Sequence, residues 1–462
     1  MIENQKLYPL TTAQKMHFFT LKYCPKKQVL NIGTSLTIET DIDFNALREA
    51  IYKAYDRCEA MRIRLVEKED GELYQYIAEK ETRYIEHVDF SNWLYDDAEA
   101  EMRKWTEQPF ERYNSPLNKV VMITMPDGYS GLYLCVDHMT MDSYSIIMFY
   151  RDIIEIYCSL KFEYPYPKER ASYIKAVEND LKCIPGTKLY DKDFEYWSNY
   201  IKESEPIYTD ILGPGRLEAQ RREFDKPHLR AANIQSGSVD ACISKFHLEP
   251  EPTSRLMKFC EDNNLPMVCL LMMGIRTYLS KMNNKESDVS IKTTVARRAT
   301  LLDKLSGGTR IYFYPCRTIV NMDDTFIDGI KIIQARQNTI FKHSNLDPIS
   351  IINMYNQNYD TNGGGYECMS LTYQPLSLKA KNELTKEINY KSRWYSNGVA
   401  ACPIYLTVMH NPLDNGMDFY FEYQKKGFTW EQLQHFYYYL CRILFKGIEN
   451  PYNTVESIID EV

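Results

Sequence analysis

The stretch LYLCVDHMTMDSYSIIMFY, residues 132–150, contains the change of pattern that decides how this chain folds. Its first half is an apolar run that predicts a buried strand, and this run breaks at Asp137 and His138. After Asp142 the apolar residues return at helical spacing over residues 143–160. The stretch therefore predicts a strand, a short polar loop and a helix, with a histidine and an aspartate four residues apart in the loop.

Length and composition limit the kind of protein that this chain can form. Its 462 residues exceed what one ordinary hydrophobic core holds, so we expect two domains or lobes. Hydrophobic residues make up 44% and charged residues 26%, as in a soluble globular protein. No apolar run approaches ~18 residues, and the N-terminus lacks a signal pattern, so we expect neither a membrane span nor secretion. A formal net charge of −8 argues against a general nucleic-acid binder, because neutralising phosphates needs excess Lys and Arg.

The twelve cysteines do not form a metal-binding or disulfide pattern. They are scattered, with no C-x-x-C pair, and several lie inside apolar runs, as Cys135 and Cys269 do. We therefore expect small buried thiols in a reducing, cytoplasmic environment. The chain also lacks a P-loop and a G-x-G-x-x-G segment after a strand, so nothing supports a nucleotide cofactor.

Periodicity elsewhere predicts a mixture of helices and strands in both halves of the chain. Helical spacing is found over residues 43–66 with Asp43 as N-cap, 97–110, 252–265, 268–282, 328–342 and 429–448 with Thr429 as N-cap. Strand patterns are found over residues 71–79, 287–295 and 309–320, and hairpins over residues 118–138 and 405–423. Residues 356–367 predict a loop, and the polar stretch over roughly 161–240 is the predicted seam between two lobes. Helices and strands are mixed along the chain without strict alternation, which indicates the α/β fold class.

The spacing of His138 and Asp142 carries little information by itself, because a given His has an Asp four residues later about once in twenty. The positions of these two residues relative to the predicted strand and helix say more about their roles. His138 lies at the exit of a strand, where a side chain can point into a cleft, and His suits proton transfer near neutral pH. Asp142 directly precedes the helical run and would make a good N-cap. These residues alone leave open both an active-site histidine and a satisfied structural one.

Six segments in a fixed order point to one family. They are YPLTTAQKMHFF (8–19), RCEAMRIRL (57–65), QPFERYNSPL (108–117), DHMTMDSYS (137–145), DFEYWSNYI (193–201) and TTVARRATLLDKLSGGTRIYFYPCR (293–317). The central segment resembles the H-H-x-x-x-D-G-x-S motif of the condensation domains of nonribosomal peptide synthetases. The others resemble, in the same order, that family's S-x-A-Q, R-H-E-x-L-R-x-x-F, P-F-D/E, aromatic and G-x-F-V-N-T-x-P-x-R segments. No single match is specific, but their order is, and the resemblance covers essentially the whole chain.

The resemblance implies an α/β fold of two chloramphenicol-acetyltransferase-like lobes, arranged as a pseudo-dimer with a tunnel between them. We expect residues 1–180 to form the N-terminal lobe with the His motif. Residues 181–462 are then the C-terminal lobe, including the linker and the cross-over and floor-loop segments. The resemblance also implies that His138 is the catalytic residue in the tunnel, whereas Asp142 points away and pairs with Arg62 as a structural anchor.

The chain departs from the family motifs at three positions. The first motif His is Asp137, the motif Gly is Ser143, and the Asn of the later motif is Tyr312. A carboxylate at position 137 would favour the imidazolium form of His138 and make it a poorer base. Ser143 would narrow the acceptor side, and Tyr312 would remove an amide from it. The remaining motif residues that we assign to the structural set and to the tunnel or acceptor side are Ser145 and Gly308, respectively.

The implied chemistry is acyl transfer that forms an amide bond. The donor would be an acyl or aminoacyl thioester on the phosphopantetheine arm of an acyl or peptidyl carrier protein. The acceptor would be a small-molecule or carrier-bound amine, and the chain would need no metal and no cofactor of its own. Two alternatives remain open: a non-catalytic condensation-like domain that recruits a carrier protein or an enzyme, and an ester-forming acyltransferase of the same superfamily.

We find no adenylation segment and no convincing serine for a phosphopantetheine group, so we expect a free-standing domain whose donor arrives on a separate protein. Carrier proteins tend to be acidic. Basic groups at Lys168–Arg170, Arg221 with Arg222, and Arg297 with Arg298 would therefore assist docking, unless they are solvated loop charges.

Overall fold

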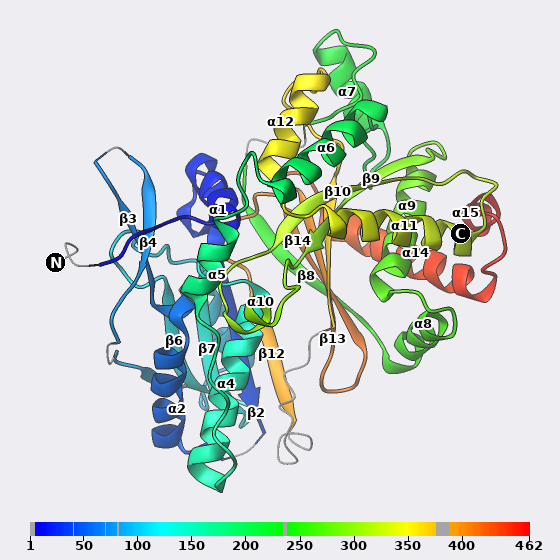
Figure 1. Ribbon diagram of the computed structural model, residues 1–462. Coiled ribbons are helices and arrows are strands. Elements are labelled where there is room, and N and C mark those ends of the chain that lie inside the picture. Colours follow the sequence, from blue (N-terminus) through cyan, green and yellow to red (C-terminus); the bar gives the residue numbers. More distant parts are fainter. Residues whose placement is uncertain (1–4, 40, 70, 81–82, 234–237, 376–388) are drawn as a thin grey trace. The chain divides into compact units, whose positions relative to one another are not determined.

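The computed structural model describes residues 5–39, 41–69, 71–80, 83–233, 238–375 and 389–462 (Figure 1). Contacts within the chain divide it into two compact units. Unit 1 comprises Met1–Cys183, Ala296–Ile311 and Leu376–Val399, and unit 2 comprises Ile184–Val295, Tyr312–Pro375 and Ala400–Val462. This division differs from the predicted lobes of residues 1–180 and 181–462, because two later segments return to unit 1. Local sequence patterns do not reveal such returns, which depend on contacts between distant parts of the chain.

Unit 1 is built on a five-stranded sheet in the order β12-β2-β7-β6-β5. These strands are Tyr390–Tyr395, Asn31–Ile38, Ser130–Asp137, Asn118–Thr124 and Glu86–Asp89. All neighbours are antiparallel except β5 and β6, which run parallel. The apolar run that predicted a buried strand is the central strand β7, in which every residue is buried.

Strand β7 is apolar throughout because both of its faces are covered. Leu132, Leu134 and Val136 join the core that contains residues of α2 (Phe44–Arg57) and α4 (Ser143–Phe162), and these two helices pack together. Tyr133 and Cys135 point to the opposite face, into a smaller core with residues of α3 (Tyr95–Thr106). Alternate side chains of β7 therefore pack against helices on the two faces of the sheet.

Smaller elements complete unit 1 around this sheet. A three-stranded sheet in the order β1-β4-β3 is formed by Tyr8–Pro9, Leu73–Ile77 and Ile63–Glu67. Unit 1 also contains the helices α1 (Thr12–Tyr23), α5 (Tyr173–Asp180) and α10 (Leu301–Leu305), and 3-10 turns at Lys27–Leu30 and Glu59–Arg62.

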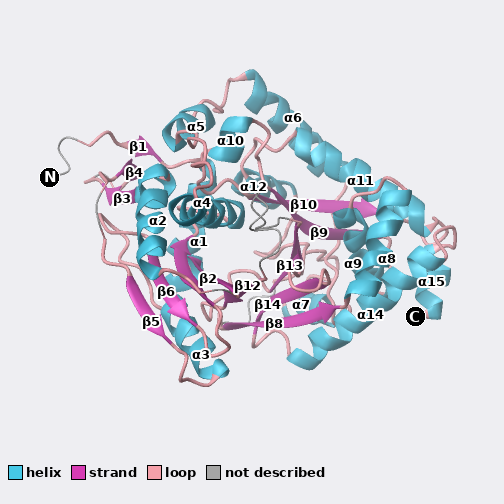
Figure 2. Ribbon diagram, turned by 90° about the horizontal axis from the view of Figure 1, so that it is seen from below, coloured by secondary structure: helices cyan, strands magenta, loops and turns pink. Residues whose placement is uncertain are grey.

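Unit 2 contains a six-stranded sheet in the order β10-β9-β11-β13-β14-β8. The strands are Tyr312–Ile319, Asp288–Val295, Met369–Gln374, Ile404–His410, Met417–Gln424 and Ala241–Leu248. Helix α9 (Met267–Met282) packs against α11 (Phe326–Lys342), α14 (Trp430–Glu449) and the sheet, as Figure 2 shows. The other helices are α6 (Lys188–Glu203), α7 (Gly215–Glu223), α8 (Pro250–Asp262), α12 (Pro348–Asn358) and α15 (Val455–Glu461).

Most predicted elements are confirmed, and so are the predicted caps. The side chains of Asp43, Asp142 and Thr429 accept hydrogen bonds from the first turns of α2, α4 and α14. The helix predicted over residues 43–66 is shorter in the structure, because α2 ends at Arg57 and the chain continues as a 3-10 turn and β3. The polar seam contains the change of unit after Cys183, and it also holds α5, α6 and α7.

The cysteines and the helices can be compared with the sequence-based expectations. All twelve cysteines are free thiols, and most of them are buried. Within the described residues, no helix combines the length and the apolar character that crossing a membrane requires.

Candidate active site

His138 lies in the loop between the end of β7 at Asp137 and the start of α4 at Ser143. Its backbone N–H donates to Leu30 O at 2.8 Å, which continues the pairing of β7 beyond the strand. The loop turns because the N–H and hydroxyl of Thr140 both donate to Asp137 O, at 2.9 and 2.8 Å. His138 remains partly exposed, whereas the residues on either side of it are buried.

Asp137 acts as an anchor of this loop. Its buried carboxylate accepts a hydrogen bond from Met139 N at 2.8 Å and forms an ion pair with Arg112. The pKa of His138 is lowered, because burial outweighs the raising effects of Asp142, its own backbone carbonyl and Asp137. Asp137 does act to raise the pKa of His138, as predicted, but burial has the larger effect, so the neutral imidazole is favoured.

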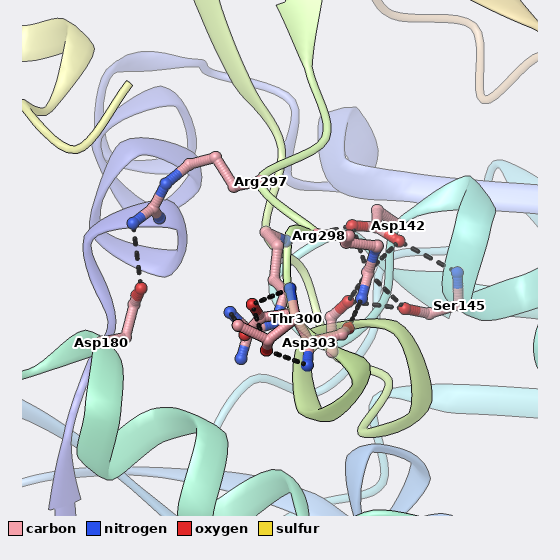
Figure 3. Close-up of polar contacts among 9 residues, drawn as sticks. Asp142, Ser145, Asp180, Arg297, Arg298, Thr300 and Asp303 are labelled. Carbon is pink, nitrogen blue, oxygen red and sulfur yellow. Dashed lines mark hydrogen bonds and ion pairs between the residues drawn. The ribbon is translucent and has the colours of Figure 1, made fainter. Parts of the chain in front are cut away.

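Asp142 is fully buried at the N-terminus of α4 and accepts hydrogen bonds from three directions (Figure 3). Arg298 Nη2 lies 2.7 Å from both carboxylate oxygens. The backbone N–H groups of Ser145 and Arg310 donate to the same carboxylate, each at 3.0 Å. Burial acts to raise the pKa of Asp142, but the Arg298 charge and the hydrogen bonds together lower it below its usual value. Asp142 is thus a charged carboxylate held in place.

The partner of Asp142 belongs to the 296–311 segment, which this contact fastens to the start of α4. Arg298 Nη2 also lies 2.8 Å from Ser145 Oγ and 2.9 Å from Gly308 O, and Nη1 donates to Asp303 O at 2.6 Å. Ser145 Oγ donates to Gly308 O at 2.6 Å. The motif Ser and Asp therefore bind one returning segment together (Figure 3).

The predicted pairing of Asp142 with Arg62 is wrong. Arg62 ends the 3-10 turn Glu59–Arg62, and its Nη1 donates to Ala78 O at 2.7 Å. The structure instead gives Asp142 an arginine that lies 156 residues further along the chain. The sequence contains Arg298 in one of the six motif segments, but nothing local indicates which arginine faces the carboxylate.

Arginines from two of the basic groups predicted for docking form ion pairs inside unit 1. Arg298 is bound to Asp142, and Arg297 Nη2 pairs with Asp180 at 3.0 Å, with both arginine side chains at most 10% exposed. Arg170 pairs with Asp152 at 3.2 Å and is 8% exposed. These arginines serve the interior of the fold, so they do not offer a free cationic surface.

The remaining predicted positions lie in different units. Gly308 has φ +85°, and a Cβ added there would lie 2.4 Å from the Tyr173 ring, so the chain needs glycine at this position. Ser143 is the first residue of α4 and is partly exposed. Tyr312 begins β10 in unit 2, where it is buried and pairs with Val295. The roles of Gly308, Ser143 and Tyr312 toward a substrate stay predictions.

Sequence reasoning missed two groups beside His138. The ring of His17 stacks on the His138 ring with centroids 4.1 Å apart, and Thr309 Oγ1 lies 3.3 Å from His17 Nε2. Both residues sit inside segments that resemble family motifs, but His17 lies three residues beyond the S-x-A-Q match and Thr309 takes the x position after the motif Gly. Gln14, a motif residue, donates to Met139 O at 3.2 Å and so ties α1 to the His138 loop.

The donor set suits proton transfer and hydrogen bonding. Across the described ranges, no group of three or more His, Cys, Asp or Glu side chains is arranged to hold a metal ion. Near His138, both carboxylates are already bound by arginines. The imidazole is the titratable side chain of this loop that remains partly exposed.

Comparison with solved structures identifies the fold. The first condensation domain of the calcium-dependent antibiotic synthetase, in complex with a substrate analogue, matches with a TM-score of 0.79 and 18% identity, over 98% of this chain and 99% of that one. The starter condensation domain of rhizomide synthetase, in complex with C8-CoA, matches with a TM-score of 0.81 and 17% identity, over 98% and 97%. The X-domain from teicoplanin biosynthesis matches with a TM-score of 0.72 and 15% identity, over 97% and 96%. The fold is that of a condensation domain, which confirms the predicted α/β class.

Comparison of sequences identifies the family. One of the plipastatin synthase proteins of Bacillus subtilis (strain 168) is 22% identical over 458 residues, 98% of this chain and 17% of that protein. Surfactin synthase subunit 1 of the same organism is 22% identical over 467 residues, 98% of this chain and 12% of that protein. The model of the condensation domain matches residues 4–459, so the chain belongs to the condensation-domain family. Condensation domains are acyltransferases that form amide bonds in nonribosomal peptide synthesis. The chain spans less than a fifth of the length of these curated relatives.

Proposed function

We propose that this protein transfers an acyl or aminoacyl group from the phosphopantetheine thioester of a carrier protein to an acceptor amine, with His138 as the catalytic residue. Membership of the condensation-domain family supports the reaction type. The observation that carries the proposal is the state of His138: a partly exposed imidazole whose pKa is lowered, in a loop where both neighbouring carboxylates are bound by arginines.

The chemistry needs one proton acceptor. The amine nitrogen attacks the thioester carbonyl carbon, a C–N bond forms, and the C–S bond breaks to release the phosphopantetheine thiolate. The neutral imidazole of His138 accepts the proton that the amine nitrogen loses, and this proton then returns to the thiolate, so that charge balances. A positioned base of this kind contributes ~10²–10⁴-fold to the rate. Holding both substrates in one geometry contributes as much or more.

The test is intact-mass analysis of an acyl-loaded carrier protein mixed with this protein and a pool of amines. We expect the wild-type protein to unload the carrier and produce an amide, and His138→Ala to lose at least ~10²-fold of that rate. His228→Ala is the matched control, because it removes an exposed imidazole that lies outside the six motif segments. An equal rate for His138→Ala and the wild type would contradict the role of His138.

The alternative is recruitment without bond formation, favoured by the departures at Asp137, Ser143 and Tyr312. It predicts that a loaded carrier co-elutes with the protein and keeps its acyl group with every amine offered. An ester product from a pool of alcohols, with no amide formed, would instead favour the ester-forming variant of the reaction.

A further inference from the structure

A second histidine lies directly against His138. His17, on α1, stacks on the His138 ring with centroids 4.1 Å apart and an angle of 26° between the planes. His17 is 5% exposed, so the stack continues from a partly exposed ring into the core of unit 1. Two imidazolium charges at this separation would repel each other, and more strongly in a protein interior than in water. The pair therefore disfavours a state in which both rings carry a charge.

Thr309 joins the two rings through one hydroxyl. Its Oγ1 lies 3.3 Å from His17 Nε2 and 3.5 Å from His138 Nδ1. A hydroxyl donates one hydrogen bond, so Thr309 can donate to only one of the two rings, and the nitrogen of the other ring must carry the proton of its bond to Thr309. In the arrangement with that proton on His138 Nδ1, the Thr309 oxygen accepts from His138 and the hydroxyl donates to His17 Nε2. This leaves Nε2 of His138 as the unprotonated nitrogen.

We propose that His17 and Thr309 are positioning residues that hold His138 in one neutral tautomer, with the proton on Nδ1 and the lone pair on Nε2. The catalytic meaning of this arrangement rests on the proposed function, because a base needs that lone pair. The tautomer itself is a property of the free protein and can be measured without a substrate.

The three groups come from different elements, and each element is separately fastened. Gln14 ties α1 to the His138 loop, through its hydrogen bond to Met139 O at 3.2 Å, and caps α1 together with Thr11. The 296–311 segment that carries Thr309 is held by the pair of Arg298 with Asp142 at 2.7 Å. The stack and the shared hydroxyl are therefore built on rigid supports, as a positioning role requires.

The charged groups around the two rings leave this assignment intact. On the loop of His138, Asp137 pairs with Arg112 and Asp142 pairs with Arg298. On the returning segment, Arg310 pairs with Asp303 at 3.1 Å. Burial, and then the charge of His138, lower the pKa of His17 well below its usual value, so His17 is neutral at neutral pH and one of its ring nitrogens can accept a hydrogen bond.

The test is NMR of the full chain labelled with ¹⁵N-histidine, using two-bond proton–nitrogen correlations and His138→Gln to assign the signals. At pH 7.5 we expect His138 of the wild type to be the Nδ1–H tautomer. Thr309→Val removes the shared hydroxyl at constant shape and should shift the tautomer ratio toward Nε2–H by about fivefold. Thr309→Ser keeps the hydroxyl and should restore the wild-type ratio.

His17→Phe keeps a stacked ring but removes the acceptor nitrogen, and we expect a shift in the same direction as for Thr309→Val. His17→Gln restores an acceptor and serves if the Phe variant does not fold, with circular dichroism to check folding. An Nε2–H tautomer in the wild type, or an unchanged ratio in both folded variants, would overturn the proposal.

An activity measurement distinguishes failure of the positioning proposal from failure of the proposed function. In the carrier assay, Thr309→Val should lower kcat about fivefold with KM unchanged. A tautomer shift in the NMR experiment without amide formation by the wild type would sink the proposed function and leave the positioning role supported. Amide formation by the wild type, with an unchanged tautomer ratio in the variants, would support the proposed function and overturn the positioning role.

Discussion

At the scale of single residues, Asp142 carries more of the stability of unit 1 than its neighbour His138. Its carboxylate binds Arg298 and two backbone N–H groups, and all of these contacts are buried. Asp142→Ala leaves the Arg298 charge buried without its counter-charge, so we expect the free energy of unfolding to fall by ~3–5 kcal/mol in urea denaturation. The control is His138→Ala, for which we expect less than ~2 kcal/mol, because it removes a partly exposed ring. Equal midpoints for the two variants would contradict this division of roles.

The titration of His17, His138 and Asp142 predicts how the free energy of unfolding changes as the pH falls. The pKa values of His17 and His138 are lowered in the folded protein, so below about pH 6.5 the unfolded chain binds protons first and stability falls. The pKa of Asp142 is also lowered, so its contribution is present above about pH 4 and is lost as the pH falls through the folded value. Urea midpoints measured from pH 8 to pH 3 should therefore drop in two steps. His17→Phe should flatten the first step, and a rise in stability between pH 7.5 and 5.5 would contradict the assignment.

At the scale of elements, the 296–311 segment depends on two successive glycines. Gly307 and Gly308 both have positive φ, at +72° and +85°. A Cβ at Gly307 would meet Ala60 at 3.4 Å, which is ordinary contact, whereas one at Gly308 would lie 2.4 Å from the Tyr173 ring. Gly307→Ala should therefore cost ~1–2 kcal/mol of unfolding free energy through backbone strain alone. Gly308→Ala should cost a further ~1–3 kcal/mol through overpacking.

Thermal or urea unfolding of the two glycine variants, side by side, measures this difference. If Gly307→Ala proved as damaging as Gly308→Ala, the close approach of Tyr173 would not be what requires glycine at position 308.

At the scale of the whole molecule, the chain leaves unit 1 after Cys183 and returns to it twice. A fragment of residues 1–183 would lack Arg298, the partner of Asp142, and strand β12, which pairs with β2. We expect this fragment to unfold without a cooperative transition in circular dichroism, whereas the full chain unfolds cooperatively. A cooperative melt of the fragment would show that unit 1 does not need the returning segments.

The local elements of this protein follow from short-range patterns. The strand, loop and helix over residues 132–150, the caps at Asp43 and Thr429 and the hairpin over residues 118–138 are all predictable, because side-chain periodicity and capping act within a few residues. The family was also predictable, because the order of six motifs along one chain is a property of the sequence.

The partners of the site residues were decided only by the tertiary structure. Sequence motifs suggested Arg62 for Asp142, but the fold brings Arg298 to it across 156 residues. No sequence pattern distinguished His17, and only the packing of α1 places its ring on His138. The sequence by itself determined most of the elements, the family and the candidate active-site loop. Which side chains face that loop, and therefore its charge state, depends on long-range packing that no local pattern records.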